Sequence, residues 1–263
     1  MRIELGSGLD IIGDIHACYE EFITLLEKLG YEQNEKCLYV HPEGRKILSL
    51  GDVMSRGPQS IECMLFFLRH VEEGVAYMID SNHGWKIARW LDGRKVQMKH
   101  GDEKVEEEFK QFEKKHGAKE TSVLKEKLKN LLMGAPSHFI ITDEGNEKVV
   151  CTHAGIKDDF IGKENSRIKD FCRYGDVAGM DEKGKPIRRD WFKEHRGELL
   201  IVWGHDPKPE PMVINNTINI DQGAVFGGKL TCYRYPEKDF VFVHALKNYS
   251  GKVGADNPIG RRD

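Results

Sequence analysis

The sequence predicts an α/β fold, and two observations support this. In the N-terminal third, short apolar runs of strand type alternate with segments whose apolar residues recur at helical spacing. In the C-terminal half, further strand-type runs follow one another with turn residues between them, such as Gly145-Asn146 and Pro236-Glu237. We therefore expect βαβ units followed by a second region dominated by strands.

The N-terminal elements are expected in the order strand, helix, strand, helix, strand. Gly30 and Gly74 are the predicted helix ends, and Pro58 suits the start of the second helix because its fixed φ is compatible with a first turn. In βαβ sheets, ligands collect beyond the carboxyl ends of the strands, so side chains that follow each strand are candidates for a site. The five elements are expected at residues 9–15, 19–29, 46–50, 58–74 and 75–79.

The rest of the chain divides into an insertion, a strand-rich region and a tail. A charge-dense segment around residues 99–133 predicts two solvated helices, each with one thin apolar stripe. The runs after it predict a mostly antiparallel sheet, at residues 139–142, 148–152, 199–203, 217–220, 229–235 and 239–245. We expect a single domain over residues 1–250 and a mobile, polar tail at 251–263.

Composition argues against several classes of protein. A net charge of −3 and a pI near 6.4 disfavour a surface built mainly for nucleic acid. The chain shows neither an apolar run of membrane-spanning length nor a signal-peptide pattern at its start, and its cysteines form no C-x-x-C pair. We therefore expect a cytoplasmic protein with reduced thiols and no membrane contact.

Ligand-type side chains follow five of the predicted strands. Any one of them is weak evidence, because an aspartate at a strand end is more often a turn former and a single histidine more often a packed core residue. Together they suggest a pair of divalent ions such as manganese, iron or zinc, which can hydrolyse phosphate esters. Asp52, with two oxygens, suits a bridge between the ions. The six candidate ligands are Asp14, His16, Asp52, Asn82, His153 and His205.

The order of these motifs resembles a known superfamily. G-D-x-H, G-D-x-x-x-R-G-P, N-H, H-A-G-I and G-H are similar to the phosphoprotein-phosphatase superfamily of metallophosphoesterases. Residues 174–176, 186–191 and 219–227 resemble its bacterial PrpE-like branch, the asymmetric bis(5′-nucleosyl)-tetraphosphatases, and the phosphatase module of bacterial polynucleotide kinase-phosphatases. The resemblance implies a calcineurin-like β-sandwich flanked by helices.

The resemblance also implies roles for individual residues. Asp14, His16 and Asp52 would hold the first of two divalent ions, and Asp52, Asn82, His153 and His205 the second. Manganese is the ion we expect, with iron, zinc and nickel as alternatives. Arg56 would grip the phosphate and His83 would protonate the leaving oxygen. Arg189 and Asp221, together with Arg188, are candidates for substrate binding.

Two positions depart from the family pattern. Ser55 stands where the motif has the aspartate that holds the catalytic histidine, so we expect His83 to lack that carboxylate unless Asp80 replaces it. Ser81 stands where the motif has glycine, and we expect a cost in backbone conformation there. A weakened general acid would favour phosphoanhydrides over phosphoserine, because an alkoxide leaving group needs the proton more.

The leading hypothesis is therefore hydrolysis of nucleotide phosphoanhydrides, such as diadenosine tetraphosphate, by a metal-held hydroxide. The expected partner is a small nucleotide, and no protein partner is indicated. Three alternatives remain: a phosphatase for RNA ends or 2′,3′-cyclic phosphates, a phosphoprotein phosphatase, and a metal-binding pseudoenzyme weakened by Ser55 and Ser81.

Overall fold

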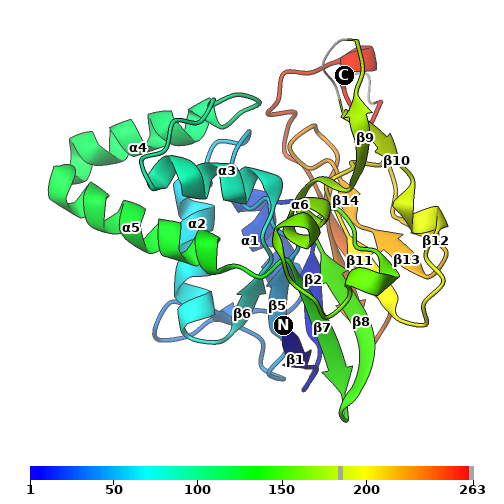
Figure 1. The fold of residues 1–263 in the computed structure, drawn as a ribbon. Helices are drawn as coiled ribbons and strands as arrows, with labels where there is room; N and C mark the ends of the chain where they lie inside the picture. Colours follow the sequence, from blue (N-terminus) through cyan, green and yellow to red (C-terminus); the bar gives the residue numbers. More distant parts are fainter. Residues whose placement is uncertain (183–185, 261–263) are drawn as a thin grey trace.

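Two six-stranded sheets lie face to face at the centre of the molecule (Figure 1). This computed structural model describes residues 1–182 and 186–260. Sheet I runs in the order β14 (Asp221–Gln222), β15 (Lys229–Tyr235), β2 (Leu9–Ile12), β5 (Lys46–Ser49) and β6 (Ala76–Met78), and β16 (Asp239–His244) pairs with β15. Sheet II runs in the order β1 (Arg2–Glu4), β7 (His138–Asp143), β8 (Asn146–Thr152), β11 (Leu200–Trp203), β13 (Thr217–Asn219) and β12 (Met212–Ile214).

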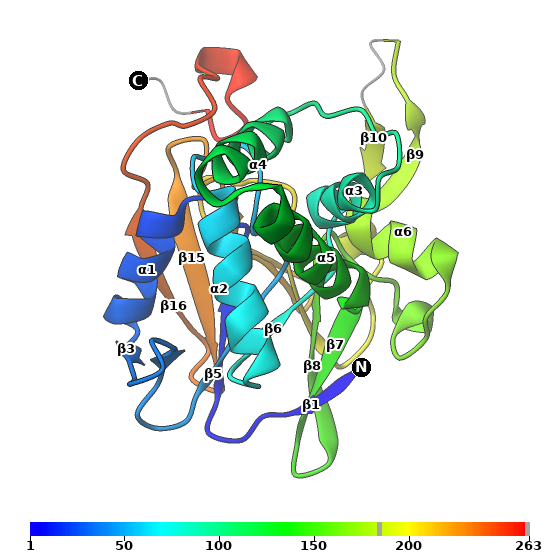
Figure 2. The same ribbon diagram turned by 90° about the vertical axis from the view of Figure 1, so that its left-hand side faces the viewer.

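The βαβ prediction for the N-terminal third is confirmed. Strands β2, β5 and β6 are parallel neighbours in sheet I, and α1 (Tyr19–Lys28) and α2 (Ser60–Glu72) connect them. Both helices cover the outer face of sheet I, as Figure 2 shows. Phe22 of α1 and Phe67 of α2 are fully buried there, because the apolar stripe of each helix needs a covered surface.

Sheet II differs from the mostly antiparallel sheet that we predicted. Strand β11 runs parallel to both β8 and β13, and β1 runs parallel to β7, while β7–β8 and β12–β13 are antiparallel. The connection from β8 to β11 is long and contains α6 (Ser166–Tyr174), which lets the chain return in the same direction. Strand patterns carry no direction, so the sequence could not reveal this.

The space between the sheets is filled by branched apolar side chains. Ile11 and Leu48 of sheet I and Val149 and Val202 of sheet II are all fully buried in this layer. A second apolar cluster packs on the outer face of sheet II, where Trp203 meets residues of α6. The resulting sandwich with helices outside is the architecture that the resemblance implied.

The predicted helical insertion is confirmed as α4 (Glu103–His116) and α5 (Ala118–Gly134), which lie against α2 and α3 (Asn82–Leu91) (Figure 2). Phe109 and Leu128 are buried in the cluster that these helices share. The remaining elements are β3 (Glu32–Gln33), β4 (Tyr39–Val40), β9 (Asp176–Met180), β10 (Pro186–Arg189) and the short 3₁₀ turns Asp158–Phe160, Trp191–Lys193 and Gly254–Asp256.

The region predicted as a tail contains two buried side chains, Asn257 and Ile259. Residues 261–263 of that prediction lie outside the described residues. Among the helices of the described residues, none combines the length and apolar character needed to cross a lipid bilayer.

Candidate metal centre

The six candidate ligands lie at one end of the sandwich. Each follows the carboxyl end of a strand: β2, β5 and β6 in sheet I, and β8 and β11 in sheet II. Because these strands run in parallel within each sheet, their carboxyl ends meet at the same edge. Five loops that are far apart in the sequence thereby converge on one site.

The carboxylate of Asp52 lies at the middle of this site. Its Oδ2 is 3.5 Å from His16 Nε2 and 3.6 Å from His153 Nε2. Two groups of ligand-type atoms, each within 4.8 Å of one another, share this residue: Asp52 with His16 and His83, and Asp52 with His153 and His205. Asp52 is 2% exposed, so the shared carboxylate has little access to water.

The hydrogen bonds of the two histidines fit the presence of cations. His153 Nδ1 lies 2.9 Å from the carbonyl oxygen of Leu50, and His16 Nδ1 lies 3.3 Å from that of Met54. A carbonyl only accepts, so each Nδ1 donates and each neutral ring turns a lone pair at Nε2 toward Asp52. Acceptors that face one another repel, whereas a metal ion between them would be coordinated by all of these atoms.

Asn82 and His205 complete the second group. His153 Nε2 is 2.8 Å from Asn82 Oδ1 and 3.1 Å from His205 Nδ1. Asn82 begins helix α3 directly after the loop that follows β6, which places its amide at the strand end. An amide oxygen and imidazoles beside a carboxylate form a donor set suited to manganese, iron or zinc.

Asp14 lies beside these groups rather than within them. Both of its carboxylate oxygens accept from the backbone N–H of His205 at 3.2 Å. Gly204 makes this approach possible, because a Cβ there would lie 2.1 Å from Asp14 Oδ1. Burial, and then the nearby Asp221 carboxylate, raise the pKa of Asp14 well above its usual value. A bound cation would offset that penalty.

His83 has a carboxylate partner that the sequence analysis missed. Its Nδ1 is 2.6 Å from Oδ1 of Asp102, whose Oδ2 is 2.5 Å from Lys86 Nζ. Asp102 is fully buried, and although burial opposes its ionisation, the hydrogen bond from His83 and the ammonium of Lys86 lower its pKa. The expectation that Ser55 leaves His83 without a carboxylate is therefore wrong.

The packing of the insertion brings Asp102 to this position. The backbone N–H of Arg56 donates to Gly101 O at 3.1 Å, and a Cβ at Gly101 would lie 2.7 Å from Arg56 Cα. Asp102 thus reaches His83 from the segment that packs against Arg56. The hydroxyl of the neighbouring Ser55 has no hydrogen-bond partner among the described residues. In the sequence Asp102 looks like an ordinary N-cap of α4, yet its side chain makes no cap hydrogen bond.

Asp80, the substitute that we considered, points elsewhere. Its Oδ2 accepts from Arg173 Nε at 2.7 Å and lies 2.6 Å from Arg173 Nη2. Burial raises the pKa of Asp80 to about 6 in spite of this partner. Asp80 therefore holds α6 against the strand end and does not orient His83.

The predicted backbone cost at Ser81 is absent. Ser81 has φ −141°, an extended conformation that any residue adopts. Its Oγ caps α3 by accepting from Gly84 N at 3.1 Å, and it also accepts from Asp52 N at 2.9 Å. Gly84 leaves room for this hydroxyl, since a Cβ there would lie 2.9 Å from Ser81 Oγ. Ser81 therefore supports the loop that presents Asp52.

The arginines differ in how close they come to the centre. Arg56 Nη2 is 3.1 Å from His83 Nε2, and Arg188 Nη2 is 2.9 Å from His205 Nε2. Arg189 instead forms a 3.8 Å ion pair with Asp176 and is largely exposed. Asp221 is buried beside Asp14, and burial raises the pKa of its carboxyl to about 7.

Comparisons with known proteins agree with this geometry. The profile of a family described as calcineurin-like phosphoesterase matches residues 9–243. A protein of Oceanobacillus iheyensis named bis(5′-nucleosyl)-tetraphosphatase PrpE (asymmetrical) is 45% identical over 249 residues, which cover 94% of this chain and 96% of the relative. A protein of the same name from Anoxybacillus flavithermus is 43% identical over 241 residues, covering 91% and 95%.

A solved structure described as a candidate diadenosine tetraphosphatase has the same fold. Its TM-score is 0.60 at 17% identity, and the match covers 94% of this chain and 98% of that one. At this identity the likeness concerns the fold alone.

Proposed function

Because this chain belongs to the calcineurin-like phosphoesterase family, we propose that it hydrolyses phosphoanhydride bonds of bis(5′-nucleosyl) tetraphosphates. Two relatives more than 40% identical over nine-tenths of the chain carry that activity in their names, which supports the substrate class. The single observation that carries a metal-dependent mechanism is the Asp52 carboxylate, which His16 and His153 face from either side.

The six ligands would hold two divalent cations, and manganese is our choice among the metals that suit them. Asp52 would serve both ions, Asp14 and His16 would complete the ligands of one, and Asn82, His153 and His205 would complete those of the other. When bound, such a pair lowers the pKa of the attacking water and neutralises charge on the phosphate.

Arg56 and His83 would act on the phosphate and on the leaving group. Arg56 Nη2 and His83 Nε2 lie 3.1 Å apart, so one phosphate can accept from both. His83 would give its Nε2 proton to the leaving oxygen, while Asp102 fixes the ring orientation through Nδ1. With Asp102 in place, neither Ser55 nor Ser81 argues for a pseudoenzyme, and the Ser55 argument for anhydrides over phosphoserine no longer applies.

Nucleotide release from diadenosine tetraphosphate with Mn²⁺ tests the proposal. We expect turnover by the unaltered protein and at least a thousandfold loss in Asp52→Asn, because both ions lose a ligand. Asp92→Asn, which changes a carboxylate paired with Arg94 far from the centre, should retain activity. Absence of turnover above the Asp52→Asn blank would overturn the proposal.

Metal binding can be followed without turnover. At a Mn²⁺ concentration of about 100 times the Kd of a site, each bound ion should raise the free energy of unfolding by about 2.7 kcal/mol. Asp52→Asn should lose most of this increase, and Asp92→Asn should keep it. An increase of equal size in both variants would place the ion outside the proposed centre.

A further inference from the structure

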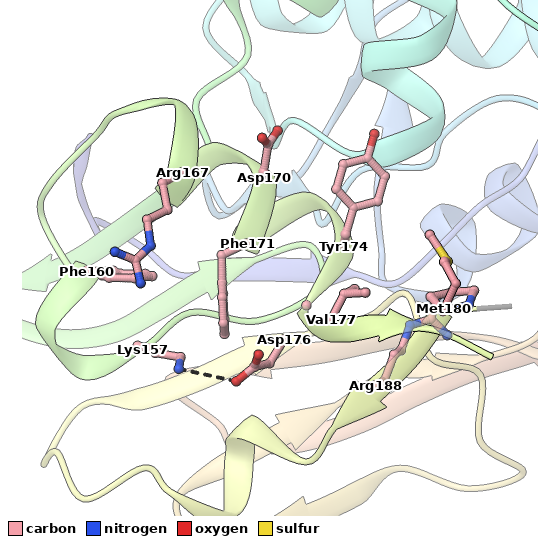
Figure 3. Close-up of a pocket in the computed structure, with 12 residues that line it drawn as sticks. Lys157, Phe160, Arg167, Asp170, Phe171, Tyr174, Asp176, Val177, Met180 and Arg188 are labelled. Carbon is pink, nitrogen blue, oxygen red and sulfur yellow. Dashed lines mark ion pairs between the residues drawn. The ribbon is translucent and has the colours of Figure 1, made fainter. Parts of the chain in front are cut away.

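A pocket of about 670 Å³ opens beside the metal centre, between helix α6 and the β9–β10 ribbon (Figure 3). We call it the α6 pocket. The residues that matter below are Lys157, Phe171, Tyr174, Asp176, Val177 and Arg188, all of which line it. None of them has a role in the chemistry proposed above, which leaves the function of this pocket open.

Arg188 connects the α6 pocket to the metal centre. Its guanidinium lines the pocket and also lies 2.9 Å from His205 Nε2. A phosphate at the centre would therefore meet a cation at the mouth of the pocket. A group attached to that phosphate can continue into the pocket without leaving the protein surface.

The pocket has the chemistry of a nucleobase site. Phe171 and Tyr174 offer aromatic surface from α6, and Val177 adds an aliphatic side chain from β9. The pocket also holds a polar pair, in which Lys157 Nζ lies 3.2 Å from Asp176 Oδ2, drawn as a dashed line in Figure 3. A planar base can stack on the rings, while the carboxylate accepts from an exocyclic amine and the ammonium donates to a ring nitrogen.

The space on the other side of the centre is different. A second pocket, of about 520 Å³, shares Tyr174 with the first and contains Asn82 and His83. We call it the basic groove, because its lining includes Arg56, Lys86, Arg89, Lys95 and Lys99. Such a concentration of cations suits a chain of phosphates better than a base.

We propose that the α6 pocket binds the nucleobase of the nucleotide whose phosphate lies at the metal centre, while the basic groove holds the remaining phosphates. This inference rests on the proposed function and adds to it the orientation of the substrate in the site. The two sides are chemically unequal, so the substrate is bound in one orientation. The base is recognised on one side and the phosphate charge on the other.

Kinetics of pocket variants test this assignment. Tyr174→Ala and Val177→Glu should lower kcat/KM for diadenosine tetraphosphate, relative to that for inorganic tripolyphosphate, about tenfold and mainly through KM. Phe240→Ala removes a comparably exposed ring (37% exposed) on β16 and should leave kcat/KM for both substrates unchanged. An unchanged ratio in both pocket variants would overturn the proposal.

Binding of adenosine separates this proposal from the proposed function, because adenosine has no phosphate and needs no metal. In saturation-transfer NMR, metal-free protein and Phe240→Ala should transfer magnetisation to the adenine protons, whereas Tyr174→Ala and Val177→Glu, the second of which changes the α6 pocket but not the basic groove, should transfer much less. Adenosine binding without turnover of any phosphate substrate would uphold the pocket and contradict the proposed function. Turnover of diadenosine tetraphosphate, together with adenosine signals of equal size in the unaltered protein and all variants, would uphold the proposed function and contradict the assignment of the pocket.

Discussion

Two buried polar clusters in this protein differ in how far its own atoms satisfy them. The first, which we call the Asp10 cluster, has all its charges paired: Asp10 accepts from Tyr31 Oη at 2.7 Å and from two nitrogens of Arg45 at 3.0 and 2.7 Å. Arg45 also reaches Glu237 at 2.6 Å. This cluster is complete without any ligand.

The metal centre is the second cluster, and there acceptors face acceptors. The lone pairs of His16 and His153 point at the carboxylate of Asp52, and Asp14 lies beside Asp221. Buried polar atoms normally have partners, so such an arrangement indicates a site that binds a cation. The comparison shows that buried charge paired within the protein stabilises the fold, whereas buried acceptors gathered around one carboxylate mark the site.

Breaking the Asp10 cluster should have the largest effect on stability. Asp10→Asn leaves the Arg45 guanidinium buried without its charge partner, and we expect a loss of about 3–5 kcal/mol in the free energy of unfolding, measured with urea. Glu237→Gln removes the partly exposed partner of the same arginine and should cost less than about 1 kcal/mol. Equal losses in the two variants would contradict the comparison.

His70 is a second buried group with satisfied hydrogen bonds, and it should make the stability of the protein depend on pH. Tyr39 N donates to its Nε2 at 2.8 Å and its Nδ1 lies 2.7 Å from Phe66 O, so the ring is satisfied when neutral. Burial lowers its pKa to about 4. The unfolded chain binds this proton below about pH 6.5, so the stabilisation is complete above that pH and is lost as pH falls toward 4, by up to about 3 kcal/mol.

Urea unfolding between pH 4 and 7 measures this dependence. Burial also lowers the pKa of His138 to about 4, which contributes in the same direction, so His70→Gln should reduce the slope without abolishing it. His244→Gln, at an exposed position, should leave the slope unchanged. A slope that His70→Gln does not alter would show that folding does not lower the pKa of this ring.

Asp102 offers a test within the metal centre. Asp102→Asn keeps the size of the side chain but removes its charge, so turnover should fall about 10²-fold, or roughly 2.7 kcal/mol. Metal-induced stabilisation should persist, because Asp102 is not a ligand. Glu106→Gln, in the helix that begins directly after Asp102, changes a carboxylate paired with Lys110 and should retain full activity.

A second change sharpens this test. Adding Ser55→Asp to Asp102→Asn places a carboxylate where the family motif has one, and we expect part of the lost turnover to return. Full activity in Asp102→Asn alone would show that the 2.6 Å contact with His83 has no role in turnover.

Ser81 should give the smallest effect. Ser81→Ala removes the cap of α3 and the acceptor of the Asp52 N–H, and should cost about 1 kcal/mol of stability together with some affinity for Mn²⁺. Asn165→Ala removes the corresponding cap of α6 and should cost a similar amount. Metal affinity should fall only in the Ser81 variant, and an equal fall in both would assign the effect to stability alone.

The βαβ units and the six ligand-type residues could be predicted from the sequence for local reasons. Apolar periodicity identifies strands and helices over a few residues, and parallel strands bring their carboxyl ends together, so Asp14, Asp52 and Asn82 had to be neighbours once the units formed. The resemblance of the motif order to a known superfamily indicated the same residues, without any argument about strands.

Only the tertiary structure decided the partner of His83. Asp102 is nineteen residues away in the sequence, and it reaches the ring because Gly101 packs against Arg56. The same holds for the direction of β11, the pairing of Asp80 with Arg173 and the hydrogen bond from Asp52 N to Ser81 Oγ. Local pattern specifies which side chains can form a site, but contacts through space depend on how whole elements pack, and no short stretch of sequence encodes that packing.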